Sequence, residues 1–270
     1  MNSLAFLWVE QVFRPVLKNL MSINAQSPEV KVLPDIPALN RAAVDEISRC
    51  ARESIAARGR FSIALSGGNT PKPVYSLLAD DKKDPAKRLS WEKVFVFFGD
   101  ERHVPPTDAE SNYRMAHESL LSRVPIPSQN VFRVQAELDA EAAARQYELQ
   151  LQNFFGVKPP QWPRFDLILL GIGPEGHTAS LFPGSEALRE NSRWVVANWV
   201  EKLNTWRITF TYPVLNNTEE VMFIVAEAGK AQILRDILKG ENQDAYPAQG
   251  VRPASGRLLW LVEKSAAALL

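Results

Sequence analysis

The chain has 270 residues, of which 46% are hydrophobic and 23% charged, as is typical of a folded globular protein. Its 31 basic and 31 acidic side chains cancel to a formal net charge of zero. No overall field then attracts nucleic acid or an anionic membrane, so neither is predicted as a partner and an anionic ligand needs a few well-placed groups. The single cysteine, Cys50, cannot form an internal disulfide or a metal cluster, which favours the cytoplasm.

Residues 1–27 are predicted to be an N-terminal extension ahead of one domain over 28–270. Phe6, Val9 and Phe13 recur at helical spacing, which favours a short amphipathic helix. No basic region precedes a continuous apolar core, so a signal peptide is not predicted. No stretch reaches the roughly 18 to 20 apolar residues that span a bilayer. A start at Met21 would instead make the first twenty residues a gene-model extension, and the sequence leaves both readings open.

Predicted strands and helices alternate along the rest of the chain. The strands are short apolar runs at Phe61–Leu65, Val94–Phe98, Phe165–Leu170, Trp194–Asn198, Arg207–Tyr212, Val221–Ala226 and Leu258–Val262. The helices cover 38–58, 71–78, 112–121, 138–154 and 229–238, and 27–37 is predicted as a loop. This alternation predicts a single-domain, Rossmann-like α/β fold with a mostly parallel sheet and helices on both faces. Ligands of such sheets bind at the carboxyl ends of the strands.

A glycine-rich turn follows the first of these strands. It reads Ser66-Gly67-Gly68-Asn69-Thr70, and Pro71 then suits the first turn of a helix. Two glycines, free N–H groups at a helix start and two hydroxyls favour a bound phosphate. A capped turn without a ligand would have the same sequence. The spacing matches neither a P-loop nor the three-glycine dinucleotide fingerprint, so ATP and NAD are not predicted.

Ionisable side chains follow two further strands. Asp100 can position a base or a substrate hydroxyl, and Arg102 offers a planar fork for a phosphate or carboxylate. His177 lies among three glycines and suits proton transfer near neutral pH, and Glu175 can orient its imidazole or act itself. A solvated charged loop and a structural histidine are the respective alternatives.

Two basic residues later in the chain are candidates for anion binding. Arg207 begins a predicted strand, and Lys230 lies at a predicted helix start, where the helix dipole opposes a lysine unless an anion binds. Ordinary surface charges are the alternative. No metal site is predicted, because His103 and His117 stand at no ligand spacing from His177.

Five blocks of the sequence occur in one order over about residues 30 to 265. They are LSGGNTP (65–71), FFGDERHVPPTDAESNY (97–113), FDLILLGIGPEGHTASLFPG (165–184), RITFTYPVLNN (207–217) and VAEAGKA (225–231). Together they resemble the glucosamine-6-phosphate isomerase/6-phosphogluconolactonase family, and the GHTASLFPG and DERHVP forms indicate the lactonase branch. The resemblance implies a Rossmann-like fold, no metal or organic cofactor, and hydrolysis of 6-phospho-D-glucono-1,5-lactone in the oxidative pentose phosphate pathway.

The same resemblance implies roles for single residues. His177 takes the place of the general base, the 66–70 turn, Arg207 and Lys230 that of the phosphate-binding groups, and Asp100 and Arg102 match site residues. Arg102 and backbone N–H groups of 173–177 are candidate donors to the oxyanion.

The chain departs from the family pattern at three places. Asn69 stands where Ser or Thr is frequent, and Glu175 where Asp is common. Residues 201–206 lack a proline run, and Lys202 in this loop is expected to assist phosphate binding. A glucosamine-6-phosphate deaminase/isomerase and a non-catalytic sugar-phosphate sensor stay as alternatives. A monomer and a small homo-oligomer are both compatible with the sequence.

Overall fold

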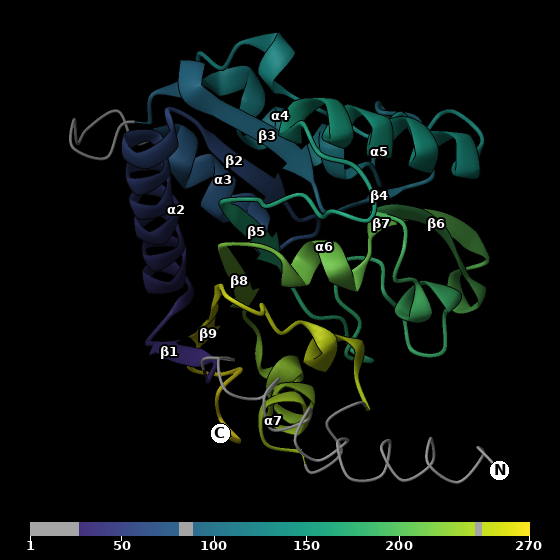
Figure 1. The fold of residues 1–270 in the computed structure, drawn as a ribbon. Coiled ribbons are helices and arrows are strands. Elements are labelled where there is room, and N and C mark those ends of the chain that lie inside the picture. The colour runs from purple at the N-terminus through teal and green to yellow at the C-terminus, as the bar shows by residue number, and fades with distance from the viewer. Residues whose placement is uncertain (1–26, 81–88, 241–244) are drawn as a thin grey trace, which may run out of the picture.

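A six-stranded parallel sheet forms the centre of the computed structural model, which describes residues 27–80, 89–240 and 245–270 (Figure 1). The strand order is β1-β9-β8-β5-β2-β3. These strands are β1 (Glu29–Leu33), β2 (Phe61–Leu65), β3 (Val94–Phe98), β5 (Leu167–Leu170), β8 (Glu220–Val225) and β9 (Arg257–Glu263). All neighbouring pairs run parallel. This arrangement confirms the predicted α/β fold.

The central sheet is buried on both faces, which explains why apolar runs predicted its inner strands correctly. In β2, Phe61 and Ile63 point into one hydrophobic core and Ala64 into the other. The first core also contains residues of α2 (Ile36–Arg58), α3 (Pro71–Asp80) and α4 (Asn112–Ser119). The second contains residues of α5 (Ala140–Phe155), α6 (Tyr212–Asn216) and α7 (Ala231–Lys239). Helices therefore cover both faces, as predicted.

A second, antiparallel sheet lies beyond the carboxyl ends of β2 and β3 (Figure 1). It consists of β4 (Asp100–Arg102), β7 (Thr205–Phe210) and β6 (Val195–Val200), with β7 in the middle. Strands β6 and β7 were predicted from the sequence with slightly different limits, but they belong to this second sheet and not to the central one. The segment predicted as a charged loop after β3 is strand β4, because Asp100 and Arg102 pair with Thr209 and Arg207.

Three further boundaries differ from the prediction. The predicted loop 27–37 contains β1, an edge strand whose Val30 and Val32 are exposed and so form no buried run. Helix α2 begins at Ile36, because the Asp35 carboxylate accepts the Ala38 N–H at 2.7 Å as an N-cap. Short 3-10 helices connect the elements: η2 (Trp91–Lys93), η3 (Leu121–Arg123), η4 (Ser128–Asn130), η5 (Glu186–Arg189), η6 (Glu201–Leu203), η7 (Ala228–Lys230) and η8 (Pro247–Gly250). Of these, η7 occupies the predicted start of the last helix.

The predicted N-terminal extension lies outside the described residues up to position 26, so it stays a prediction. None of the helices that the structure describes combines the length and the apolar character needed to cross a bilayer.

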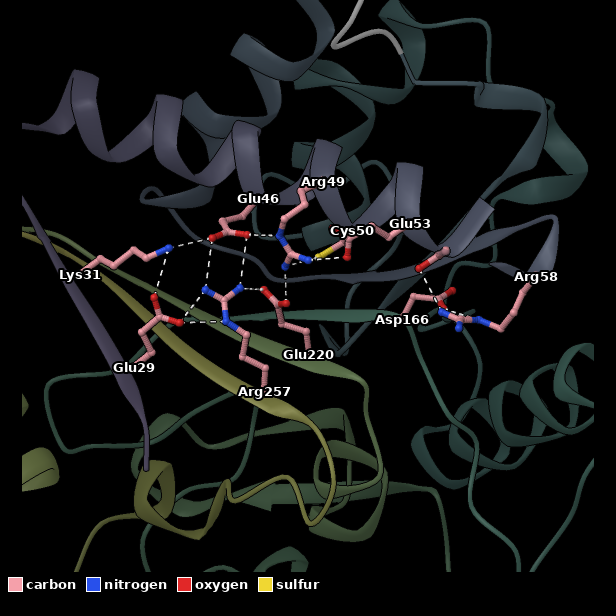
Figure 2. A network of polar contacts seen from close by, with 11 residues as sticks. Glu29, Lys31, Glu46, Arg49, Cys50, Glu53, Arg58, Asp166, Glu220 and Arg257 are labelled. Carbon is pink, nitrogen blue, oxygen red and sulfur yellow. Dashed lines mark hydrogen bonds and ion pairs between the residues drawn. The ribbon is translucent and has the colours of Figure 1, made fainter. Parts of the chain in front are cut away.

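Charged side chains cluster at the amino ends of β1, β8 and β9, opposite the carboxyl edge (Figure 2). Arg257 donates to Glu29 at 2.7 Å, to Glu220 at 3.0 Å and to Glu46 of α2 at 3.3 Å. Arg49 of α2 bonds Glu46 at 2.7 Å and also reaches Glu220. These pairs join α2 to three strands of the sheet.

Two largely buried side chains in and beside this network, Glu46 and Cys50, have shifted pKa values. Burial, the largest single influence, raises the pKa of Glu46, but Arg257, Arg49 and Lys31 outweigh it and hold that pKa at about 2. Cys50 of α2 packs into the first core, and burial raises its thiol pKa.

Candidate active site

The strand order defines where a ligand is expected. Strands β2 and β5 are neighbours in the sheet. The next strand of the central sheet after β2 is β3, on the side away from β5, and the next after β5 is β8, on the side away from β2. The loops that follow β2 and β5 therefore lead in opposite directions. Such a switch point at the carboxyl edge is the usual ligand site of open α/β sheets. Here the loops after β2, β5 and β8, together with β4 and α4, surround a cavity of about 270 Å³. We call it the switch-point cavity.

Most of the predicted site residues line this cavity. Its wall consists of Ser66, Gly67, Gly68, Asn69, Thr70, Pro71, Asp100, Arg102, Asn112, Gly171, Ile172, Gly173, His177, Ala179, Ile224, Val225, Ala226, Glu227 and Lys230. The five residues of the predicted turn, two residues of β4, the histidine and the lysine thus come together from segments far apart in sequence. Glu175, Lys202 and Arg207 are not in its wall.

His177 is held tightly by its own loop. The imidazole stacks on the Phe182 ring with centroids 4.1 Å apart, and the His177 carbonyl accepts the Gly173 N–H at 2.8 Å. A Cβ atom at position 173 would lie 2.0 Å from ring atoms of His177. Only glycine therefore allows the ring to occupy this place.

Glu175 flanks the imidazole and connects it to a surface lysine. Its Oε2 lies 3.1 Å from His177 Nδ1, within hydrogen-bonding distance, although neither atom makes a well-aligned hydrogen bond. Its Oε1 accepts from Lys202 Nζ at 3.3 Å. The structure thus places Lys202 beside Glu175, in the wall of a neighbouring hollow of about 860 Å³ rather than of the switch-point cavity.

Burial and charge act on the imidazole in opposite directions. Burial lowers the pKa of His177, and the adjacent Glu175 carboxylate only partly offsets this effect. The imidazole is therefore neutral at pH 7 and able to accept a proton. Burial alone would raise the pKa of Glu175, but backbone hydrogen bonding, His177 and Lys202 lower it, so the carboxylate is ionised.

Asp100 is buried and held by two residues that the sequence analysis did not single out. Ser180 Oγ donates to Asp100 Oδ2 at 2.7 Å, and Asn112 Nδ2 donates to the Asp100 carbonyl at 3.0 Å. The second sheet fixes Ser180 in turn, through the Thr209 hydroxyl and the Asn198 side chain. The only sequence signal for Ser180 and Asn112 was their place inside the quoted blocks.

Two guanidinium groups lie next to each other on β4 and β7. Arg102 and Arg207 are direct cross-strand neighbours. Burial and then the positive charge of Arg102 lower the pKa of Arg207. Arg102 donates to the Glu110 carbonyl at 2.6 Å. Within the described part of the chain, neither Arg207 nor Lys230 has a carboxylate at ion-pair distance, so both charges are free to meet an anionic ligand.

The 66–70 turn is fixed from behind and open toward the cavity. The Tyr75 hydroxyl donates to the Ser66 carbonyl at 2.8 Å and accepts the Ser66 N–H at 3.0 Å. Gly68 has a φ of +97°, which excludes most other residues. The Ser66 side chain is also within hydrogen-bonding reach of Tyr75, whereas the Thr70 hydroxyl has no hydrogen-bond partner among residues 27–80, 89–240 and 245–270. Thr70 lines the cavity, so its hydroxyl is available to a ligand.

Backbone strain also concentrates at this cavity. Ala179 (φ 45°) and Glu227 (φ 79°) are non-glycine residues with positive φ, and both line it. Such conformations cost about 1 to 3 kcal/mol each and cluster at functional sites. Among the described residues, no group of three His, Cys, Asp or Glu side chains is arranged to hold a metal ion.

The structure defines an α/β protein with a parallel sheet and a cavity at its switch point, and the lysine, arginine and neutral histidine in the cavity wall are suited to binding a small anion and moving a proton. The sequence model of the glucosamine-6-phosphate isomerases/6-phosphogluconolactonase matches residues 34–260, and the chain belongs to this family. It is 42% identical over 243 residues to a 6-phosphogluconolactonase of Nostoc sp., covering 89% of this chain and 98% of the relative. A 6-phosphogluconolactonase of Synechocystis sp. is 41% identical, with 89% and 97% covered.

Solved structures agree with this assignment. The 6-phosphogluconolactonase of Thermotoga maritima superposes with a TM-score of 0.76 at 30% identity, covering 88% of this chain and 100% of that one. A monomeric glucosamine-6-phosphate deaminase reaches a TM-score of 0.75 at 19% identity, with 90% and 100% covered. The second likeness shows a shared fold alone.

Proposed function

We propose that the switch-point cavity hydrolyses 6-phospho-D-glucono-1,5-lactone to 6-phosphogluconate, with His177 as the general base. That the chain is a hydrolase with 6-phosphogluconolactonase activity follows from its family and its full-length relatives. The finer proposal rests on one observation: a single cavity brings the His177 imidazole together with the 66–70 turn and Lys230. One small molecule can therefore contact all three.

The phosphate is bound at the cationic side of the cavity. The 66–70 turn offers hydroxyl and N–H groups, Lys230 adds a positive charge, and Arg207 reinforces the field next to Arg102. Anchoring this remote group supplies binding energy that fixes the lactone ring against the base. Asp100, held by Ser180 and Asn112, accepts a hydrogen bond from a ring hydroxyl.

The chemistry needs one base and one oxyanion donor. Neutral His177 takes a proton from a water molecule as the water oxygen attacks C1, and then returns that proton to the ring oxygen as the C–O bond breaks. Glu175 orients the imidazole and stabilises its cationic form. The N–H groups of Gly173 and Gly176 already donate to backbone carbonyls at 2.8 and 3.0 Å. Arg102 and the N–H groups of Glu175 and His177 are therefore the remaining candidates for the oxyanion donor.

A coupled assay tests the assignment. The lactone is generated in situ from glucose 6-phosphate, the acid is trapped by 6-phosphogluconate dehydrogenase, and spontaneous hydrolysis is subtracted. His177→Ala should lose about 10²- to 10⁴-fold in kcat and still bind 6-phosphogluconate. His117→Ala, at an exposed histidine of α4, is the matched control. Wild-type turnover by His177→Ala would refute the general base, and tight 6-phosphogluconate binding without any turnover by the wild type would identify a sensor.

The cytoplasmic location and the choice between a monomer and a small homo-oligomer stay predictions.

A further inference from the structure

Asn112 stands between the two halves of the switch-point cavity. It is 2% exposed and lies in the cavity wall between the 66–70 turn and Asp100. Its Nδ2 donates to the Asp100 carbonyl at 3.0 Å and lies 3.4 Å from Asp100 Oδ1. Its main-chain N–H donates to the Glu101 carboxylate at 2.7 Å, which fixes the start of α4. The amide is therefore attached firmly to the strand that carries Asp100.

The other end of the Asn112 side chain faces the 66–70 turn. Its Oδ1 is buried and has no hydrogen-bond partner in the described part of the chain. It is pressed against Gly67, where an added Cβ would lie 1.8 Å from Oδ1 and 2.3 Å from Cγ of Asn112. Gly67 has no positive φ, so its backbone would accept alanine. The nearest obstacle to a side chain at position 67 is therefore the Asn112 amide.

An asparagine kept only for stability would satisfy both ends of its amide, because a buried unpaired carbonyl is unfavourable. Asn112 satisfies only the end that holds Asp100 and uses the other as a spacer against the turn. We propose that Asn112 is a positioning residue that sets the distance between the 66–70 turn and Asp100. The inference rests on the proposed function, in which the turn binds the phosphate and Asp100 a ring hydroxyl.

The proposal separates ligands that touch one half of the cavity from ligands that span both. Inorganic phosphate needs the turn alone, whereas 6-phosphogluconate and the lactone need the turn and Asp100 at the right separation. Asn112→Asp keeps the shape against Gly67 but cannot donate to Asp100. We expect this variant to lose about 10²-fold in kcat, the scale for a misplaced reacting group. Its new carboxylate repels either anion, so affinity for inorganic phosphate falls as well, but affinity for 6-phosphogluconate should fall further.

Two further variants test the spacer. Gly67→Ala should weaken phosphate binding, because its Cβ collides with Asn112. The double variant Gly67→Ala/Asn112→Ala removes the colliding atoms and should recover phosphate affinity without recovering kcat. Asn130→Asp is the matched control, because Asn130 is also buried and donates to two backbone carbonyls outside the cavity. It should lower thermal stability and leave kcat unchanged.

The outcomes distinguish this inference from the function on which it rests. Wild-type kcat in Asn112→Asp would overturn it. Equal losses of phosphate and 6-phosphogluconate affinity in Asn112→Asp, with a fall in Tm like that of Asn130→Asp, would reduce Asn112 to a structural residue and also overturn it. Both affinities are measured without turnover. Failure of His177 as the base therefore leaves this test standing.

Discussion

Replacing Glu175 by glutamine should change both the rate and its pH dependence. The general base must be neutral, so kcat/KM rises with pH through the pKa of His177. Burial holds that pKa below its ordinary value, and Glu175 raises it in opposition. Without the carboxylate the pKa falls further. The acidic limb of the profile should therefore move to lower pH in Glu175→Gln.

The plateau should fall at the same time, because the cationic imidazole that forms during the reaction loses its partner. The two groups lie 3.1 Å apart at their nearest atoms and are a quarter exposed. Unit charges about 4 Å apart attract by about 1 kcal/mol in water and about 4 kcal/mol at an effective dielectric constant of 20. A loss of about 1 to 3 kcal/mol then corresponds to about 5- to 150-fold in kcat.

The assay is the coupled measurement of kcat and kcat/KM across pH, with Glu186→Gln as the control. Glu186 lines the neighbouring hollow together with Glu175 but is not among the groups that influence the pKa of His177, so its replacement should leave the profile unchanged. An acidic limb of Glu175→Gln that stays in place, or moves to higher pH, would refute the assigned electrostatic role.

Two more predictions follow from the structure. Gly173→Ala should lower kcat by about 10²-fold, because its Cβ would displace the imidazole of His177. Gly229→Ala is the control and should leave kcat unchanged, because a Cβ at position 229 would meet open space. Equal kcat values in the two variants would contradict the packing argument. Glu46→Gln should lower the free energy of unfolding by about 2 kcal/mol at pH 7, against about 0.5 kcal/mol or less for the exposed Glu53→Gln. Since the pKa of Glu46 is depressed to about 2, its contribution is complete above the unfolded value of 4.5 and is lost as pH falls toward 2. Chemical denaturation should show that the gap between Glu46→Gln and the wild type closes over this range, and a gap constant with pH would contradict it.

Sequence patterns predicted correctly those strands whose own residues form a recognisable apolar run. The strands Phe61–Leu65 and Val94–Phe98 were predicted with their observed limits, because strands covered on both faces are continuous apolar runs. Strand β1 was missed because, at the sheet edge, it leaves Val30 and Val32 exposed. Strand β4 was missed because it has three polar residues and exists through pairing with β7, about a hundred residues away.

The same division applies to the site. Loops that follow strands were correctly expected at one edge, so His177, the 66–70 turn and Lys230 meet in one cavity. Asn112 contacts Gly67, and Lys202 contacts Glu175, in each case across the fold. No local sequence pattern encodes such contacts. Lys202 was therefore expected to assist phosphate binding, whereas the structure places it beside the Glu175 carboxylate.

The two edges of the central sheet differ in how well their charges are satisfied. At the amino edge, Arg257 and Arg49 are paired with carboxylates of α2 and the strands (Figure 2). At the carboxyl edge, Arg207 and Lys230 lack carboxylate partners within the described chain, and Asn112 Oδ1 is unpaired. A domain with a net stability of about 5 to 15 kcal/mol tolerates such groups only where the surrounding structure holds them in place. An anionic ligand would supply the partners that Arg207 and Lys230 lack, which supports the proposal that the substrate binds at the carboxyl edge.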